Sequence, residues 1–313
     1  MDPRIVPTLE SLIGLQHEAR GFSFLHGQPV TSLLAGRRAS RIRGRGLSFE
    51  EIRGYRPGDD IRLIDWRASA RTGRTQTRVY TEERDRPALL VVNLTTATFF
   101  GTKHATKTAI IAQSAALAAW RSLQSGDRVG AVLFGDDGIE EHRPHRSRAA
   151  VMRILGAMSA RAERLAAAPS RPALPGALNA ALRAAEAMVT HDWLVLVVGD
   201  AQAADETSRE ILGRMARHND VVGIVVSDPL ERALPAAPWR GVATDGARVG
   251  VLDPARDGLG EKVPRSHAER IAWLRDSGLS LQIPVLPIGT EEPAAPQLRR
   301  MLGAAASPRQ VRR

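Results

Sequence analysis

The sequence predicts an α/β protein built around a doubly wound, mostly parallel β-sheet. Nearly continuous apolar runs at residues 88–94, 128–134, 193–198 and 221–227 have the length and composition of strands buried on both faces. Segments with helical periodicity lie between them, at 103–124, 148–165, 177–189 and 206–217. Strands that alternate with helices in this way favour crossover connections within one parallel sheet.

We expect five segments along the chain. They are a helical lead-in at 1–35, an arginine-rich segment of short strands and loops at 36–86, the α/β domain at 87–230, a C-terminal α/β extension at 231–302 and a disordered tail at 303–313. Within them we predict strands at 77–81, at the sheet edge at 139–143, and at 248–252 and 280–286, and a helix at 266–276. Ser147 is predicted to cap the helix that begins at Arg148.

Length and composition are those of a globular protein. The chain has 313 residues, of which 43% are hydrophobic, so it is long enough to bury a sizeable core. It has no cysteine, which excludes disulfides and thiolate metal sites and fits a reducing compartment. No apolar run approaches the ~20 residues needed to cross a bilayer, and the first residues lack a signal-peptide pattern. We therefore expect a cytoplasmic protein.

The chain is strongly basic, with a formal net charge of +10. Such a charge suits nucleic acid, anionic lipid or an acidic protein as a partner. Lysine occurs only at positions 103, 107 and 262, so arginine carries nearly all of the positive charge. A preference for arginine over lysine often reflects genome base composition. The sequence also lacks helix-turn-helix, zinc-finger and interleaved aromatic patterns, so basicity alone is weak evidence for nucleic-acid binding.

The arginine-rich segment carries a long motif. It reads GRGLSF at 44–49, RGYRPGDD at 53–60, IRLIDW at 61–66 and SARTG at 69–73. Shorter matches follow at 83–84, 101–102, 126–130, 134–135, 228–231 and 234–235. Over roughly residues 30–290 the chain therefore resembles the family called domain of unknown function 58.

The resemblance implies a fold and a partner. Proteins of this kind combine the arginine-rich segment with a von Willebrand factor A-like domain. They are associated with MoxR-type AAA+ ATPases and are thought to assist the assembly or maturation of client proteins. The resemblance thus implies an interaction or adaptor protein that acts with such an ATPase on an unknown client.

The residues of the motif allow two physical interpretations. Residues 36–78 hold twelve arginines and five acidic residues, and arginine suits bidentate pairing with carboxylates. An internal lattice of ion pairs would hold a loop-rich segment in shape; alternatively, the surplus arginines would form a docking face for a partner or an anion. Trp66 is predicted to be a buried core residue. The motif residues that these interpretations concern are Arg53, Tyr55, Arg56, Asp59, Asp60, Arg62, Asp65, Trp66 and Arg71.

The resemblance also implies a position for a metal site, which is largely lost here. Von Willebrand A domains that bind Mg²⁺ use an Asp-x-Ser-x-Ser loop, a Thr from a second loop and a later Asp. Asn93, Thr95 and Asp200 retain three polar groups of this pattern, whereas Ala97 and the region near Gly176 lack the hydroxyls. We expect Asn93 and Asp200 to act as strand-end caps, with a weak Mg²⁺ site as the alternative and no other cofactor.

No catalytic motif accompanies these features. The sequence has no P-loop, no Gly-x-Ser-x-Gly elbow and no His-Glu-x-x-His zinc motif, so we expect a protein that is not an enzyme. Two hypotheses follow. In the first, an interaction protein docks an AAA+ ATPase or its client through residues 93–98 and Asp200, with the arginine-rich segment contributing. The alternative is a basic nucleic-acid-binding protein that uses those arginines.

Overall fold

The computed structural model describes residues 1–20, 24, 47–56, 59–82, 86–167, 174–200, 202–235, 240–244, 249–253 and 258–303. The chain divides into two compact units, a small one at residues 40–85 and a large one formed by residues 1–39 and 86–313. In the described part, no helix combines the length and apolarity needed to cross a bilayer.

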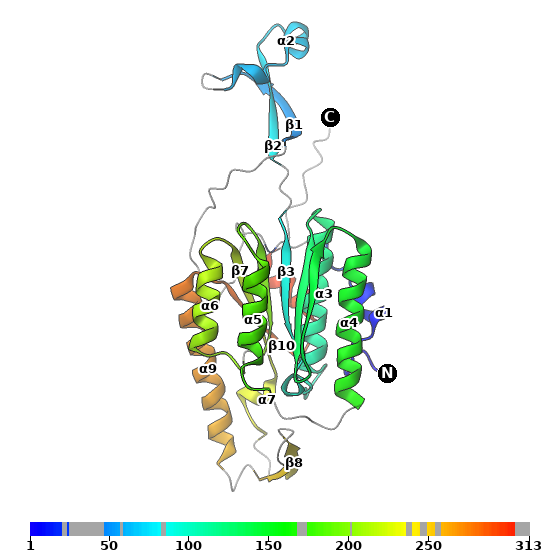
Figure 1. Ribbon diagram of the computed structural model, residues 1–313, viewed down its shortest axis with the longest axis vertical. Coiled ribbons are helices and arrows are strands. Elements are labelled where there is room, and N and C mark those ends of the chain that lie inside the picture. Colours follow the sequence, from blue (N-terminus) through cyan, green and yellow to red (C-terminus); the bar gives the residue numbers. More distant parts are fainter. Residues whose placement is uncertain are drawn as a thin grey trace. The chain divides into compact units, whose positions relative to one another are not determined.

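The large unit contains the predicted sheet (Figure 1). Its strands, in spatial order, are β10 (Val285–Gly289), β7 (Asp220–Ser227), β6 (Leu194–Gly199), β3 (Ala88–Asn93), β4 (Val129–Gly135) and β5 (Gly138–His145). All neighbours pair in parallel except β5, which runs antiparallel to β4 at the edge. The predicted α/β class, the mostly parallel sheet and the edge strand are confirmed, and the arrangement is consistent with a von Willebrand factor A-like fold.

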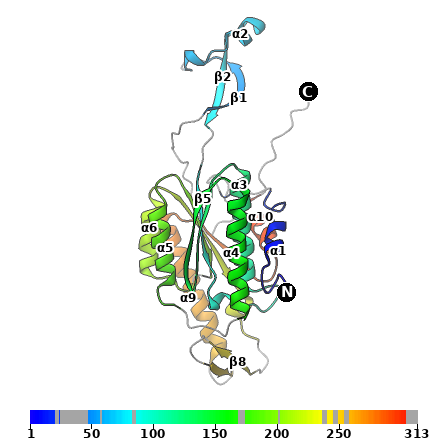
Figure 2. The same ribbon diagram turned by 45° about the vertical axis from the view of Figure 1, so that its right-hand side comes forward.

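Helices cover both faces of this sheet (Figure 2). On one face α1 (Leu9–Gly14), α3 (Lys107–Gln124), α4 (Arg148–Ala167) and α10 (Ala294–Leu302) share a core with one set of strand side chains. On the other, α5 (Ala177–Met188) and α6 (Glu206–Ala216) pack against the alternate set. This division follows from strand geometry, because Leu90 faces one layer and Leu89 the other. Ser147 caps α4 as predicted, accepting a hydrogen bond from the Ala150 amide at 3.1 Å.

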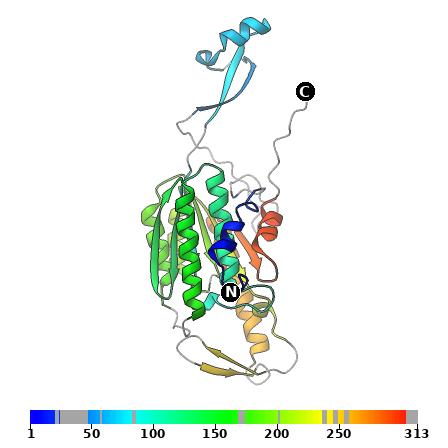
Figure 3. The same cartoon turned by 90° about the vertical axis from the view of Figure 1, so that its right-hand side faces the viewer.

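Helix α3 lies at the centre of the first layer. It begins after Thr106, whose hydroxyl accepts a hydrogen bond from the Ala109 amide, and it is buried along most of its length. The N-terminal segment packs against it (Figure 3), and the Trp120 indole donates a hydrogen bond to the Leu12 carbonyl. Leu12 is buried within the helical lead-in predicted at 1–35, and most of residues 21–35 lies outside the described part of the chain.

The C-terminal segment extends the same sheet. Strand β10 pairs with β7, and α10 returns to the α3 layer. Helix α9 (Leu259–Leu281) is longer than the predicted 266–276, and the strand predicted at 280–286 begins only at Val285. That boundary was wrong because the helix continues to Leu281 and ends where Gln282 adopts a left-handed conformation at φ 58°.

Three further short elements belong to the large unit. Residues 229–232 form α7 (Pro229–Arg232), and β8 (Gly241–Thr244) pairs antiparallel with β9 (Val249–Leu252), which confirms the strand predicted there. The tail predicted to be disordered lies, apart from Gly303, outside the described residues.

The small unit is a β-hairpin with helical turns between its strands. Strand β1 (Leu47–Gly54) pairs antiparallel with β2 (Gln76–Glu82), and η1 (Ile61–Leu63) and α2 (Trp66–Thr72) lie between them in sequence. The short strands expected in this segment are therefore present. Pro57 and Gly58 of the motif lie outside the described residues.

Trp66 corrects a prediction. Its side chain is 72% exposed, although it was predicted to be a buried core residue. The physical reason is the size of the unit, because a segment of fewer than about 50 residues has little interior in which to bury a tryptophan. Helix α2 instead turns Ala68 inward, and that alanine is buried.

Candidate functional site

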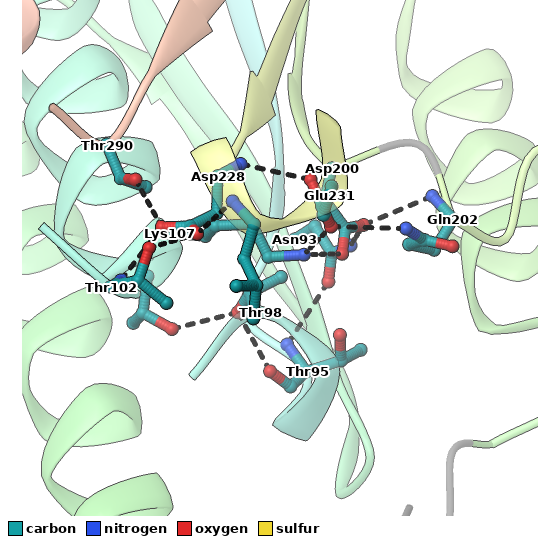
Figure 4. A network of polar contacts seen from close by, with 12 residues as sticks. Asn93, Thr95, Thr98, Thr102, Lys107, Asp200, Gln202, Asp228, Glu231 and Thr290 are labelled. Carbon is teal, nitrogen blue, oxygen red and sulfur yellow. Dashed lines mark hydrogen bonds and ion pairs between the residues drawn. The ribbon is translucent and has the colours of Figure 1, made fainter. Parts of the chain in front are cut away.

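Polar side chains gather where the parallel strands of the large unit end. Asn93 is the last residue of β3, Asp200 follows β6, Asp228 follows β7 and Thr290 follows β10. Open parallel sheets present their ligand sites at this carboxyl edge. We call Asn93, Lys107, Asp200, Asp228 and Glu231 the strand-edge cluster (Figure 4).

Lys107 is the central cation of this cluster. Its side chain is 3% exposed, and its ammonium donates hydrogen bonds to Asp200 Oδ2 at 3.0 Å and to Glu231 Oε1 at 2.9 Å. Burial by itself lowers the pKa of Lys107, but the two carboxylates outweigh that effect and hold the pKa above its ordinary value. The ammonium therefore stays charged at neutral pH.

The three predicted residues of the strand edge are joined by hydrogen bonds, and Asp200 links them to this lysine. Asn93 Nδ2 donates to Asp200 Oδ1 at 3.2 Å, and Asn93 Oδ1 accepts from the Thr95 amide at 3.1 Å. Asp200 Oδ1 also accepts from the Gln202 amide at 3.2 Å. These are the contacts of strand-end caps, because each side chain holds the backbone two residues further along.

This arrangement does not fit a divalent cation. Both oxygens of Asp200 already accept hydrogen bonds, and the Lys107 ammonium supplies the positive charge between Asp200 and Glu231. A metal ion there would lie close to a buried ammonium. Mg²⁺ also needs an octahedron of oxygen ligands, and in the described residues no three His, Asp or Glu side chains gather as metal ligands would.

Asp228 joins the neighbouring loops to the cluster. It is fully buried and accepts hydrogen bonds from the Thr102 hydroxyl and amide and from the Thr290 hydroxyl. Burial would raise the pKa of Asp228, but these donors and the Leu230 amide outweigh it and hold the pKa below its ordinary value. The Asp228 amide in turn donates to Glu231 Oε2, so the carboxylate that binds Lys107 is itself fixed in place.

A pocket of about 280 Å³ opens beside the cluster, with Glu231 in its wall. The remaining lining residues are Gln202 and, from α9, Lys262, Val263, Ser266, His267 and Arg270. Gln202 Nε2 donates to Glu231 at 3.4 Å, and Arg270 donates to the Gln202 carbonyl at 2.8 Å. Burial lowers the pKa of His267, so its imidazole is neutral at pH 7. The pocket thus offers donors and cationic groups to a polar side chain or a small ligand.

The motif residues of the small unit form local ion pairs and caps. Arg53 binds Asp59 through two hydrogen bonds of 2.8 and 2.9 Å, and Asp65 binds Arg78 at 2.9 Å while capping α2 through the Ala68 amide. The Arg53 guanidinium lowers the pKa of Asp59, and the Ala68 amide, followed by Arg78, lowers the pKa of Asp65. The predicted pairing of these aspartates with arginines of the same segment is therefore present.

The remaining motif residues have other environments. Asp60 caps η1 by accepting from the Arg62 amide at 2.9 Å, and Tyr55 is half-buried with its amide bonded to the Thr75 carbonyl. Arg56, Arg62 and Arg71 are exposed, and their guanidinium groups make no ion pair or hydrogen bond with any residue that the structure describes. Only some arginines of the motif therefore take part in ion pairs.

Sequence reasoning missed Lys107 and Glu231. One signal for Lys107 was available, because it is one of three lysines and stands in the first turn of a largely apolar helix. Glu231 completes the Asp-Pro-Leu-Glu capping box of α7. That these two residues meet could not be inferred, since they lie 124 positions apart.

Comparison with known proteins places the chain in a family. Residues 51–248 match the family described as "Protein of unknown function DUF58". The chain belongs to the DUF58 family. It is 27% identical over 261 residues to Uncharacterized protein Rv1480 of Mycobacterium tuberculosis and to Uncharacterized protein Mb1516 of Mycobacterium bovis. Each match covers 81% of this chain and 79% of the relative.

Two solved structures with some similarity come from Bacteroides species. The conserved hypothetical protein BatB of Bacteroides thetaiotaomicron matches 63% of this DUF58 chain and 98% of its own, at 12% identity and a TM-score of 0.37. An aerotolerance-related membrane protein of Bacteroides fragilis matches 69% of this chain and 98% of its own, at 12% identity and a TM-score of 0.39.

Proposed function

We propose that this DUF58 protein is a non-enzymatic interaction protein that binds a partner at the carboxyl edge of its sheet without a metal ion. The observation that carries the proposal is the buried Lys107 ammonium held between Asp200 and Glu231. Because the Lys107 ammonium supplies the positive charge, the edge keeps its shape and charge without a bound metal ion. The adjacent pocket provides room for a side chain of the partner.

The chemistry of the edge supports binding over catalysis. Lys107, Asp200 and Glu231 are engaged with one another, and both carboxylates accept additional hydrogen bonds. A general base or nucleophile needs a lone pair directed at a substrate. Asp200 and Glu231 direct theirs at Lys107 and at nearby amides, which suits a structural role.

The partner we propose is the MoxR-type AAA+ ATPase that the family resemblance implies, together with a client protein of unknown identity. The support is the family membership and the presence of a pocket at the expected edge. The cytoplasmic location expected from the sequence stays a prediction.

Blocking the pocket tests the proposal. Ser266 is an exposed residue of the pocket lining on α9, and Ser266→Trp would fill the space that a partner side chain needs. We expect the dissociation constant for the purified AAA+ ATPase, measured by biolayer interferometry with ADP present, to rise about tenfold or more. Ala268→Trp is the matched control, because residue 268 is exposed on the same helix and does not line the pocket.

Two outcomes would contradict the proposal. Equal binding by the wild type and Ser266→Trp would place the interface elsewhere. Binding that disappears in EDTA and returns with millimolar Mg²⁺, while light scattering shows the ATPase assembly unchanged, would show that recognition depends on a metal.

A further inference from the structure

The small unit exposes large apolar side chains. Trp66 is 72% exposed and Ile61 is 67% exposed, although both belong to residue types that are usually at least partly hidden. Tryptophan is the residue most enriched at the energetic centres of protein interfaces. Its exposure here has no structural role that the described contacts of the unit reveal.

Ile61 and Trp66 lie near three arginines in the chain, so that one partner could contact all five residues. Ile61 and Trp66 are five residues apart, so even in an extended chain their Cα atoms would be separated by no more than about 18 Å. Arg67 and Arg71 share one side of α2, about one helical turn apart, and Arg62 lies in η1. We call Ile61, Arg62, Trp66, Arg67 and Arg71 the tryptophan–arginine surface.

The positive charge of this surface has no ion-pair partner among the side chains that the structure describes. Arg62, Arg67 and Arg71 are exposed, and their guanidiniums form no ion pair or hydrogen bond with the residues that the structure describes. The nearby carboxylates are already engaged: Asp59 binds Arg53, Asp60 caps η1 and Asp65 binds Arg78. The complementary partner is therefore acidic.

We propose that the tryptophan–arginine surface docks an acidic protein surface that has an apolar pocket for Trp66. Arginine and tryptophan alone would also suit nucleic acid, which offers phosphates and stacked bases. The exposed Ile61 favours protein, because an aliphatic side chain gains little from a phosphate backbone and much from an apolar pocket. The inference rests on the proposed function and adds a second contact face to it.

Two variants of the full-length protein test the inference. Trp66→Ala removes the anchor, and Arg67→Glu combined with Arg71→Glu reverses the charge of α2. Each should raise the dissociation constant for the purified AAA+ ATPase by about tenfold or more. The matched controls are Leu279→Ala and Arg153→Glu, which change an exposed leucine of α9 and an exposed arginine of α4 and should leave binding unchanged. Circular dichroism and thermal melting would show that every variant is folded.

The outcomes separate this inference from the proposed function. If the wild type does not bind the ATPase, both fail. If the wild type binds and both surface variants bind equally well, only the tryptophan–arginine surface is overturned. It is also overturned if those variants keep ATPase binding but lose a steeply salt-dependent affinity for a DNA duplex, because the surface would then serve nucleic acid.

Discussion

At the scale of single residues, the charge balance around Lys107 explains how three charged side chains can pack together at the carboxyl edge of the sheet. One ammonium lies between two carboxylates, which leaves one negative charge for other groups to stabilise. Asp200 receives hydrogen bonds from Asn93 Nδ2 and the Gln202 amide, and Glu231 receives them from Gln202 Nε2 and the Asp228 amide. Buried ion pairs are tolerated only when their remaining lone pairs are satisfied in this way.

Replacement of Lys107 should therefore be costly. Lys107→Met keeps much of the side-chain volume but leaves two carboxylates without their cation in a buried site. We expect the free energy of unfolding, measured by urea denaturation, to fall by about 3–5 kcal/mol. Lys103→Met, at an exposed position, should change it by no more than about 0.5 kcal/mol. A Lys107→Met protein as stable as the wild type would show that the pairs add nothing to folding.

Divalent ions should not stabilise the wild-type protein. A ligand present at about 100 times its dissociation constant adds about 2.7 kcal/mol to the native state, enough to shift the melting temperature by a few degrees. With Lys107 already paired to Asp200, we expect the same melting temperature in EDTA as in millimolar Mg²⁺ or Mn²⁺. A metal-dependent rise that Asp200→Ala abolishes would revive a metal-bridged mechanism.

Asp228 should contribute to the acid sensitivity of the fold. Because its folded-state pKa is lowered, its contribution to stability is present above the unfolded pKa near 3.9 and is lost as pH falls through the folded value. Asp228→Asn should be less stable than the wild type at pH 7, and this difference should shrink below about pH 4. Urea denaturation at neutral and acidic pH measures both quantities. A difference that stays constant with pH would mean that the charge of Asp228 is not involved.

At the scale of elements, how well the sequence predicts the fold depends on how local the signal is. The runs at 88–94 and 193–198 identify buried strands because a strand covered on both faces must be apolar throughout. The end of α9 could not be predicted, because Ser280 and Leu281 suit a helix or a strand equally and tertiary packing decides. The exposure of Trp66 was missed for a related reason: whether a tryptophan is buried depends on how large a unit surrounds it.

The attachment of α1 to α3 leads to a prediction at this scale. Trp120 is fully buried, donates to the Leu12 carbonyl at 3.0 Å and has the Arg148 guanidinium 5.3 Å from its ring centre. Trp120→Phe would leave that carbonyl without its donor and a small cavity beside it. We expect a loss of about 1–3 kcal/mol in unfolding free energy. Faster amide hydrogen exchange at residues 9–14 would show that α1 has loosened, and unchanged exchange would contradict the attachment.

At the scale of the whole molecule, the chain carries two candidate contact faces in two compact units. The pocket beside the strand-edge cluster belongs to the large unit, and the tryptophan–arginine surface belongs to the small one. The sequence indicated the strand edge and the arginine-rich segment as candidate contact regions, but it could not show which role each one has. The arginine motif is continuous in sequence, whereas the strand-edge cluster unites Asn93, Lys107, Asp200 and Glu231 only after folding.

A double-mutant cycle tests whether both faces bind the same partner. Ser266→Trp and Trp66→Ala change residues in different compact units, so their effects on the binding free energy should add. If each variant raises the dissociation constant for the ATPase about tenfold, the double variant should raise it about a hundredfold. A double variant no weaker than either single one would mean that the two changes disturb a single contact, with one of them acting indirectly. Additivity would instead show that the two faces contribute independently to binding of the same partner.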